Sequence, residues 1–317
     1  MNGQMARSGQ AAIAASAVAF GVGTTLSVVA LHGLRPADLL AVELAGSAAV
    51  LLTVAAATGR LRRAGAGSAL AQGAVLPGLS FLLGDLGLAR TTATSGALLS
   101  SIDAIATVLL SALFLRERVG RAVGAALALG TAGTVLVAVN APDDGMAAVG
   151  GSETLGNLLV LASVVGGAAY VVWSRRTARP VEEGVGRTAW QFLGATLAVL
   201  PFVLGSWWTG GSHITTAQPH HLVAAVAVLF CGLGALLAFN IGIGAVSASH
   251  AGLLFTLQPL AGALTAVALL GEPLVAGQAA GGALILACLV ILARAETGDR
   301  SGPPADLPTA PTVATTR

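Results

Sequence analysis

The chain has 317 residues, of which 55% are hydrophobic and only 9% are charged, with a formal net charge of +2. A water-soluble domain carries about a quarter of charged residues because its surface must be solvated, so this composition excludes an ordinary soluble domain. It indicates an integral membrane protein, in which small residues allow helices to approach closely within lipid.

The apolar windows, taken in chain order, predict ten transmembrane helices. A helix needs about 20 residues to cross the hydrocarbon core of a bilayer. Charge-poor windows of this length run over residues 10–31, 37–58, 67–89, 92–115, 119–139, 154–174, 188–208, 222–246, 249–270 and 274–294. The first is expected to be an uncleaved span rather than a signal peptide, because further apolar windows follow it. Residues 296–317, rich in Pro, Thr and Ala, are predicted to form a disordered cytoplasmic tail.

The arginines predict how the chain is oriented in the membrane. All 16 basic residues are arginines, and with the amino terminus inside, 14 of them fall in cytoplasmic segments. Only Arg35 and Arg90 fall outside. Cytoplasmic loops of membrane proteins carry an excess of basic residues. The sequence therefore predicts a multi-pass protein of the cell membrane with both termini in the cytoplasm.

The chain contains an internal repeat. Residues 87–119 align without a gap onto residues 242–274, and the pair Glu117/Glu272 is the most informative identity because each glutamate ends a long apolar run. Each half holds five predicted helices, so the second half must insert upside down. We therefore predict an all-α membrane protein built from two inverted five-helix repeats, residues 10–139 and 154–295. A duplicated structural bundle without a transport pathway is the alternative.

The second repeat carries a set of motifs that the first repeat copies less well. They are L-L-x-x-x-x-P over Leu253–Pro259 and G-E-x-L over Gly271–Leu274, followed by Gln278, Gly281 and Gly282. In the first repeat Ala104 replaces the proline and Arg116 replaces the glycine. The pattern resembles the EamA-type transporters of the drug/metabolite transporter superfamily, over about residues 10–295. The resemblance implies the fold of that superfamily and a role similar to exporters of amino acids, nucleobases, drugs or other metabolites.

Three acidic residues, Glu43, Asp85 and Asp103, lie inside predicted spans. An ionisable group at the centre of a bilayer costs about 2.5–3.5 kcal/mol on insertion scales, so each requires a partner or a function. By the helical rise, Asp103 lies about 18 Å from either end of its span, Glu43 about 10 Å and Asp85 about 7 Å from the outer face. All three are expected to border one cavity open to the outside.

The repeat pairs each acid with an amide. Asp85 aligns with Asn240 and Asp103 with Gln258 at an offset of 155, and Glu43 aligns with Gln191 at an offset of 148. This predicts a pseudosymmetric substrate-binding site near the midplane, formed by Asp103, Gln258, Glu43, Gln191, Asn240 and Asp85. Asp103 and Glu43 are the candidates for coupling to a proton or another cation. The alternative is that these residues only pack, with Asp85 paired to Arg90.

Several further residues are expected to serve packing. Gly96, Ser100, Thr107 and Ser111 share the helix face of Asp103 and should face protein or water rather than lipid. Glu117 and Glu272 are expected to cap or pair at loop ends, and Pro259 to kink its span. The patterns Gly120–Gly124 and Gly277–Gly281 predict close helix packing, with a homodimer contact as the alternative.

No residue set in the sequence indicates catalysis. The chain has no phosphate-binding loop, and His213, His220 and His221 lack a partner at metal-ligand spacing, so we expect no enzyme activity, cofactor, metal or nucleic-acid partner. The expected partners are a small-molecule solute and the lipid bilayer. The sequence predicts a secondary transporter that exports small polar or amphipathic metabolites, amino-acid-like or drug-like, by alternating access. An accessory or scaffold protein with a degenerate transporter fold and a membrane enzyme acting on a lipid-linked substrate are the alternatives.

Overall fold

The apolar segments form helices because lipid offers no hydrogen-bond partner to the backbone, so each segment must satisfy its own N–H and C=O groups. The computed structural model describes residues 2–88, 90, 99, 102–117, 119–140, 153–271 and 274–299, and all regular structure within these ranges is helical. The predicted all-α class is confirmed for this part of the chain.

The helices divide between the two halves of the chain. The first half contributes α1 (Asn2–Leu31), α2 (Pro36–Leu40), η1 (Ala41–Ala45), α3 (Gly46–Ala57), α4 (Ala66–Gly73), η2 (Ala74–Leu79), α5 (Ser80–Leu88), α7 (Asp103–Phe114) and α8 (Arg121–Val139). The second half contributes α9 (Glu153–Arg176), η3 (Val181–Glu183), α10 (Gly184–Gly210), α11 (Pro219–Gly242), α12 (Ala248–Leu254), α13 (Leu257–Thr265), η4 (Ala266–Leu270) and α14 (Ala276–Asp299).

Nine segments of the described residues are long and apolar enough to cross a membrane. Four of these spans combine more than one helical piece: α2–η1–α3, α4–η2–α5, η3–α10 and α12–α13–η4. The predicted span over residues 92–115 is represented by the shorter apolar helix α7, and residues 91–98 and 100–101 lie outside the described residues. The count of ten therefore stays a prediction. Helix α14 extends to Asp299, so the first residues of the predicted tail are helical and residues 300–317 are not described.

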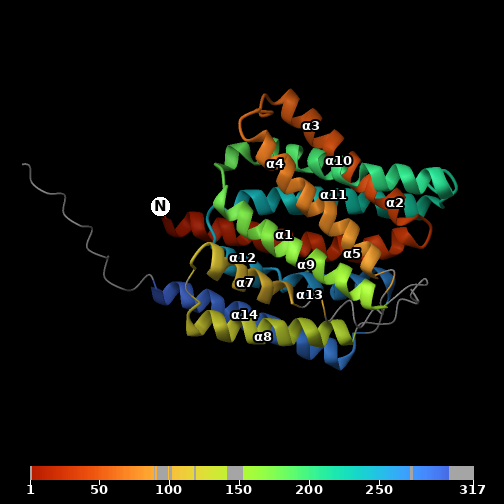
Figure 1. Cartoon of the computed structure of the whole chain (residues 1–317). Helices are drawn as coiled ribbons and strands as arrows, with labels where there is room; N and C mark the ends of the chain where they lie inside the picture. Colours follow the sequence, from red (N-terminus) through yellow and green to blue (C-terminus); the bar gives the residue numbers. More distant parts are fainter. Residues whose placement is uncertain are drawn as a thin grey trace, which may run out of the picture.

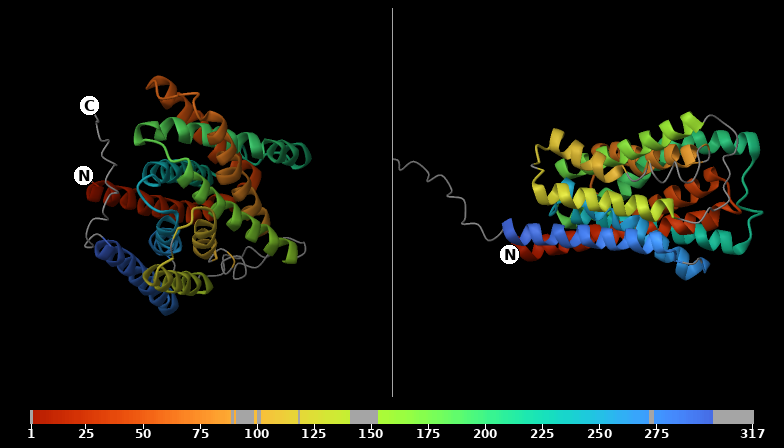
Figure 2. Two further views of the ribbon diagram at one scale, coloured as in Figure 1. Left: turned by 60° about the vertical axis from the view of Figure 1, so that its left-hand side comes forward. Right: turned by 90° about the horizontal axis from the view of Figure 1, so that it is seen from below.

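Helices from the two halves pack against one another throughout the bundle. Helix α1 packs along α11 and α5 packs along α9, so the first span of each half contacts the third span of the other half. Helices α8 and α14, the last span of each half, lie side by side at one edge of the bundle (Figure 1 and Figure 2). Helix α10 packs against α3 and α4 away from that edge (Figure 1). Fully buried side chains such as Phe192 and Phe239 fill the interior between these layers.

Arginines gather at one end of the bundle, which we call the arginine-rich end. The segment before α4 meets α10 there, since the Trp190 Nε1–H donates to the Arg62 carbonyl oxygen at 2.9 Å. The Arg62 guanidinium also lies 3.7 Å from the Glu183 carboxylate. The described arginines of this end include Arg60, Arg62, Arg63, Arg175, Arg176, Arg179 and Arg187. This separation of charge agrees with the predicted orientation, whose sidedness stays a prediction.

The opposite end is held together by Asp38 at the start of the second span. Its carboxylate accepts hydrogen bonds from Trp207 Nε1 at 2.9 Å, Ser212 Oγ at 2.7 Å and the backbone N–H groups of His213 at 3.0 Å and Arg35 at 3.2 Å. Charge-assisted hydrogen bonds are stronger than neutral ones. Asp38 therefore joins the loop before α2 to the loop after α10.

Pro259 lies beside an interruption in the ninth predicted span, as expected. Helix α12 ends at Leu254 and α13 begins at Leu257, with a turn at Phe255 and Thr256 between them. Pro259 occupies the first turn of α13, where a backbone N–H has no intrahelical partner to lose. The α-helix is therefore interrupted just before the proline, and the kink itself stays a prediction.

The glycine patterns differ in what they contact. A Cβ at Gly281 would lie 2.6 Å from the Gly133 carbonyl oxygen, and a Cβ at Gly277 would meet the Asn140 side chain, so close packing is confirmed for this pair of glycines. Gly120 and Gly124 have no described atom within 4 Å of an added Cβ. Close packing within the chain is therefore wrong for the Gly120–Gly124 pattern, because α8 approaches α14 through Gly133 instead.

Candidate functional site

Three amide side chains form a buried hydrogen-bonded chain between the two halves. Gln191 of α10 donates from Nε2 to Gln72 Oε1 at 3.0 Å, and Asn240 of α11 donates from Nδ2 to Gln191 Oε1 at 2.6 Å. Asn240 Nδ2 also donates to Thr188 Oγ1 at 2.9 Å. Gln72 lies on α4 of the first half, whereas the other residues belong to the second half. We call Gln72, Gln191, Asn240 and Thr188 the amide network.

The amide network lies towards the arginine-rich end. Asn240 precedes the end of α11 by two residues, which is about 3 Å along the helix, and Gln191 lies seven residues, about 10 Å, from the start of α10. The structure therefore brings together two of the predicted site residues, Gln191 and Asn240, and places them closer to one end of the bundle than to its centre.

Arg187 continues the amide network to the end of the bundle. Its side chain is only 8% exposed. The guanidinium donates to Gln72 Oε1 at 2.9 Å, to the Thr177 carbonyl oxygen at 2.9 Å and to Thr177 Oγ1 at 3.1 Å. All three acceptors are neutral, and within the described ranges no carboxylate lies within ion-pair distance of Arg187. A buried charge without a counter-ion carries a desolvation cost, and an anion bound to this guanidinium would offset it.

A cavity of about 480 Å³ opens beside Arg187 at the arginine-rich end. Buried Gln72 and Arg187 line it together with Trp190, so the cavity reaches the amide network. Its exposed wall carries further arginines and a single carboxylate, that of Glu183. Cavities of about 300–1,000 Å³ are typical of small-molecule sites.

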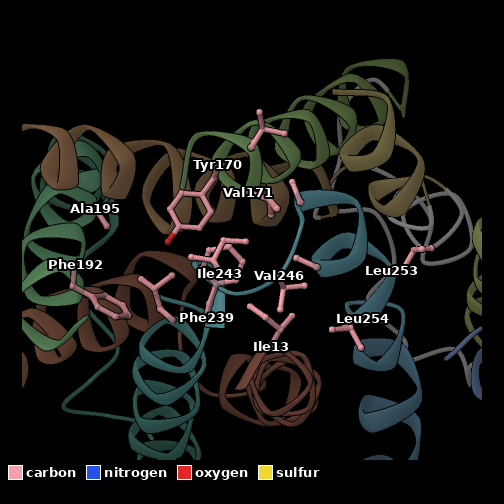
Figure 3. Packing of buried hydrophobic residues seen from close by; sticks show 14 of the residues in the cluster. Ile13, Tyr170, Val171, Phe192, Ala195, Phe239, Ile243, Val246, Leu253 and Leu254 are labelled. Carbon is pink, nitrogen blue, oxygen red and sulfur yellow. The ribbon is translucent and has the colours of Figure 1, made fainter. Parts of the chain in front are cut away.

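Buried polar groups with spare hydrogen-bonding capacity lie at the amide network. Asn240 Oδ1 has no partner, and the Tyr170 hydroxyl lies close to the side chains of Ser174 and Gln191. The Tyr170 ring of α9 packs on Phe239 of α11 with ring centroids 5.4 Å apart, and Figure 3 shows its hydroxyl on the side of Phe192 and Phe239. Buried polar groups are normally paired, so this part of the interior retains hydrogen-bonding capacity for a further group.

No hydrogen bond joins the three acids to the amide network within the described part of the chain. Glu43 is buried in the π-helical turn η1, and a Cβ at Gly232 of α11 would lie 2.6 Å from its Oε1, so glycine is needed there. Asp85 of α5 is half-buried and lies close enough to Glu43 to interact electrostatically. Asp103 begins α7 and faces Gly167 of α9, where a Cβ would lie 3.8 Å from Oδ1. Isolated π-helical turns are frequent at functional sites.

Asp85 does not form the expected ion pair with Arg90. The Arg90 guanidinium donates to the Leu86 carbonyl oxygen at 2.7 Å, and the described residues contain no ion pair between Asp85 and Arg90. The alternative in which Arg90 neutralises Asp85 is therefore wrong for this structure.

Gln258 lies in the first turn of α13 and is half-buried, with its backbone against Gly21 of α1. A series of aromatic contacts passes close to it: Phe20 contacts Phe81 and Phe255, and Phe255 contacts Phe239, with ring centroids 6.0–6.3 Å apart. No hydrogen bond joins Gln258 to the other predicted site residues within the described part of the chain. The series of aromatic contacts continues from Phe239 to Tyr170.

The helix face of Asp103 packs against the second half rather than lipid. Thr107 and Ser111 are buried, and Ser111 Oγ lies 2.6 Å from Ser249 Oγ of α12. A Cβ at Gly252 of α12 would lie 2.7 Å from the Thr107 side chain. The expectation that this face meets protein is confirmed for Thr107 and Ser111, while Gly96 and Ser100 lie outside the described residues.

Glu117 caps the start of α12, as expected for a glutamate at a loop end. Its two carboxylate oxygens accept the backbone N–H groups of Ala248 at 2.8 Å and Ser249 at 2.9 Å, and Oε2 also accepts Ser249 Oγ at 2.6 Å. Partial burial raises the pKa of Glu117, but the hydrogen bonds outweigh burial and hold the pKa below its ordinary value. Glu272 lies outside the described residues.

A comparison with models of protein families identifies the family of this helical bundle. The model described as the EamA-like transporter family matches residues 7–139 and 154–294, which is most of the chain and both halves of it. The chain belongs to the EamA-like transporter family. The suspected resemblance is therefore confirmed, and the family indicates a membrane transporter for this EamA-like protein.

Solved structures agree on the fold, and 29 of their chains match. One of them, titled "Crystal structure of protein", aligns with a TM-score of 0.69 and 22% sequence identity, over 91% of this chain and 98% of that chain. At this identity the likeness shows the fold alone. No curated protein matches the EamA-like chain.

The sequence did not indicate Gln72 or Arg187 as members of a site. Gln72 is the only amide between residues 67 and 89, which was a usable signal. Arg187 directly precedes the window 188–208, so the sequence alone indicates a loop arginine. No His, Cys, Asp and Glu cluster suited to a metal ion occurs among the described residues.

Proposed function

We propose that this EamA-like protein is a secondary transporter that exports small polar or amphipathic metabolites, amino-acid-like or drug-like, by alternating access. Its two five-helix repeats, residues 10–139 and 154–295, would be inverted relative to each other. The amino and carboxyl termini would lie in the cytoplasm of a cell whose plasma membrane holds the protein.

The pairing of helices supports the inverted arrangement. A twofold axis in the membrane plane maps the first span of one repeat onto the first span of the other, and the third span onto the third. The contact of α1 with α11 then corresponds to that of α9 with α5, and the last spans α8 and α14 correspond to each other. Rocking of two such repeats would open a shared site to each side in turn.

The observation that carries this function is the amide network beside the cavity. Buried amides are costly in a membrane bundle unless they are paired or bind something, and intramembrane polar groups commonly mark solute pathways. Gln72 comes from one repeat, whereas Gln191 and Asn240 come from the other. A relative movement of the repeats would therefore break or remake the contact between Gln72 and Gln191, at the place where the cavity ends.

The three acids support coupling to a proton or another cation. Glu43 and Asp85 lie near each other, and Asp103 faces α9 across the interface between repeats. Carboxylates held inside a bundle are the groups that carry protons in many pumps and transporters. Asp103 and Glu43 are our candidates for this role.

The proposal is tested by the metabolites that cells release. Cells expressing the wild type, cells expressing Asp103→Asn and cells carrying an empty vector are compared, with the abundance of the two proteins matched. We expect at least one small metabolite to be released by the wild type above the vector level, and to be released less by the variant.

Equal release from all three cell lines would contradict export. The accessory-protein function would then be favoured by co-purification of one partner at fixed stoichiometry. Turnover of a lipid-linked substrate by the purified protein would instead favour an enzyme.

A further inference from the structure

The cavity at the arginine-rich end has an unusually one-sided charge. Its lining includes Arg60, Arg62, Arg176, Arg179 and Arg187, against the single carboxylate of Glu183. That carboxylate already faces the Arg62 guanidinium at 3.7 Å. Basic residues at one end of a membrane protein are explained by its orientation. Orientation does not explain why one of them is buried without a counter-ion.

Arg187 is that buried residue. Its side chain is 8% exposed, and its guanidinium donates to neutral oxygens of Gln72 and Thr177. These contacts fix the guanidinium in the wall of the cavity without neutralising it. Removing a cation from water costs several kcal/mol unless an opposite charge replaces the lost solvation. An anion in the cavity would supply this charge.

The rest of the lining suits an organic anion. Arginine presents several N–H donors in a planar fork that matches a carboxylate or a phosphate. Trp190 lines the same cavity with its indole fixed by the hydrogen bond from Nε1 to the Arg62 carbonyl oxygen, and so offers an apolar wall. A volume of about 480 Å³ accommodates a small molecule.

We propose that this cavity binds the carboxylate or phosphate group of a small organic anion, with Arg187 as the principal ligand of the oxyanion. Gln72 then places the anion beside Gln191, since Gln72 Oε1 accepts from both Arg187 and Gln191. The inference rests on the proposed transport function, because it assigns the charge of the solute. Binding itself is measurable without transport.

The test measures equilibrium binding to the purified full chain in phosphatidylcholine nanodiscs by isothermal titration calorimetry. The probes are inorganic phosphate and benzoate, with benzyl alcohol as the neutral match of benzoate. We expect benzoate or phosphate to bind and benzyl alcohol to bind at least about tenfold more weakly, since a hydrogen bond to a charged group is worth this factor or more. Raising the ionic strength from about 0.05 M to about 0.5 M should weaken the binding, because screening reduces the attraction.

Two variants locate the site. Arg187→Gln should weaken anion binding by about 10- to 100-fold, the loss expected for a charged hydrogen bond. Arg63→Gln is the matched control, because Arg63 is exposed at the same end and does not line the cavity. Its affinity should stay within about twofold of the wild type.

A further variant keeps the test valid if Arg187→Gln fails to fold. The double change Arg60→Gln and Arg179→Gln alters only exposed side chains of the cavity wall. It should weaken binding by about three- to tenfold, as expected for two partly solvated charges. Binding that none of these changes weakens, or the absence of binding by both probes, would overturn the assignment.

A lipid headgroup shares the chemistry of the phosphate probe, and a second nanodisc distinguishes the two sources. If discs that contain phosphatidylglycerol abolish probe binding to the wild type, and Arg187→Gln loses bound lipid, the oxyanion site stands with lipid as its occupant. Probe binding that is unaffected by phosphatidylglycerol assigns the site to a soluble anion.

The outcomes also separate this inference from the transport proposal. Release of only a cationic or neutral metabolite, with no binding of either probe, contradicts the anion site and leaves the transporter function in place. Binding through Arg187 without release of any solute contradicts export and leaves the anion site in place.

Discussion

At the scale of single residues, the structure uses carboxylates and amides to join segments that are distant in the chain. Glu117 of the first half stabilises the start of α12 in the second half. Asp38 joins the loops before α2 and after α10 at the opposite end. Each acid accepts backbone N–H groups that would otherwise lack a partner, so each stabilises a contact between helices as well as a helix end.

Replacement of Glu117 by alanine should destabilise the protein in a pH-dependent manner. The carboxylate cap is worth about 1–2 kcal/mol. Because the folded pKa lies below the ordinary value of 4.5, the stabilisation is fully present above about pH 4.5 and is lost as the pH falls through the folded pKa. Thermal unfolding in detergent should therefore show a gap between wild type and Glu117→Ala at pH 7 that narrows in acid. Exposed Glu182→Ala is the control, and a gap that does not depend on pH would contradict the cap.

Asp103→Asn should remove the pH dependence of transport if Asp103 carries the coupling proton. The change preserves the size of the side chain while removing its ionisation, and the other acids of the predicted spans, Glu43 and Asp85, remain in place. The measurement is the initial rate of solute flux in proteoliposomes over a range of pH. A variant whose rate follows pH as the wild type does would exclude Asp103 from coupling and leave Glu43 as the candidate.

At the scale of helices, glycine is needed for packing only where the backbones of two helices come into close contact. Helices α8 and α14 meet where Gly133 and Gly281 face each other, and an added Cβ on either would lie within 2.7 Å of the carbonyl oxygen of the other. Small residues permit such approaches, which provide the packing that holds helices together in lipid. Gly120 and Gly124 resemble this arrangement in spacing alone, because a Cβ added at either position would have no described atom within 4 Å.

Gly133→Ala should destabilise the protein, whereas Gly124→Ala on the same helix should not. The first change forces a methyl group against the Gly281 carbonyl oxygen and Ile285, at a cost of about 1–3 kcal/mol. The second adds a methyl group in open space, where alanine favours the helix over glycine by roughly 0.5–1 kcal/mol. Thermal unfolding of both variants in one detergent checks this, and equal midpoints would contradict the packing of α8 on α14.

At the scale of the whole molecule, the two ends of the bundle differ in charge and in chemistry. One end carries the arginines and the cavity, and the other carries Asp38, the exposed Trp208 and the loop histidines. An orientation with the arginine-rich end inside would let the cavity receive solutes from the cytoplasm. This is the side from which an exporter must load.

Labelling of single cysteines should place the two ends on opposite sides of the membrane. After removal of Cys231 and Cys288, Trp208→Cys and Val181→Cys introduce thiols at exposed positions, 90% and 54% exposed in the wild type. In intact cells an impermeant maleimide should react with the Trp208→Cys variant, and with the Val181→Cys variant only after permeabilisation, as the arginine distribution requires. The reverse pattern would invert the orientation and make the cavity face outward.

Much of the fold follows from the sequence because lipid leaves few alternatives. A scarcity of charge and windows of about 20 apolar residues are sufficient to predict a multi-pass helical bundle. The resemblance to the EamA-like family rests instead on the motifs of the second repeat. The interruption beside Pro259 and the cap by Glu117 also follow from local chemistry, since a missing N–H and a carboxylate after an apolar run have few roles. These features depend on neighbours in the chain or on the solvent.

The candidate site depended on the tertiary structure because it is formed by contacts between helices far apart in the chain. The repeat aligned Gln191 with Glu43 and Asn240 with Asp85, yet the side chains that Gln191 meets are Asn240 and Gln72. The sequence placed Arg187 among the loop arginines, and only packing buried it in the wall of a cavity without a counter-ion. Composition and periodicity determine which surfaces avoid water, but they do not determine which helices become neighbours, and that choice decides which polar groups meet.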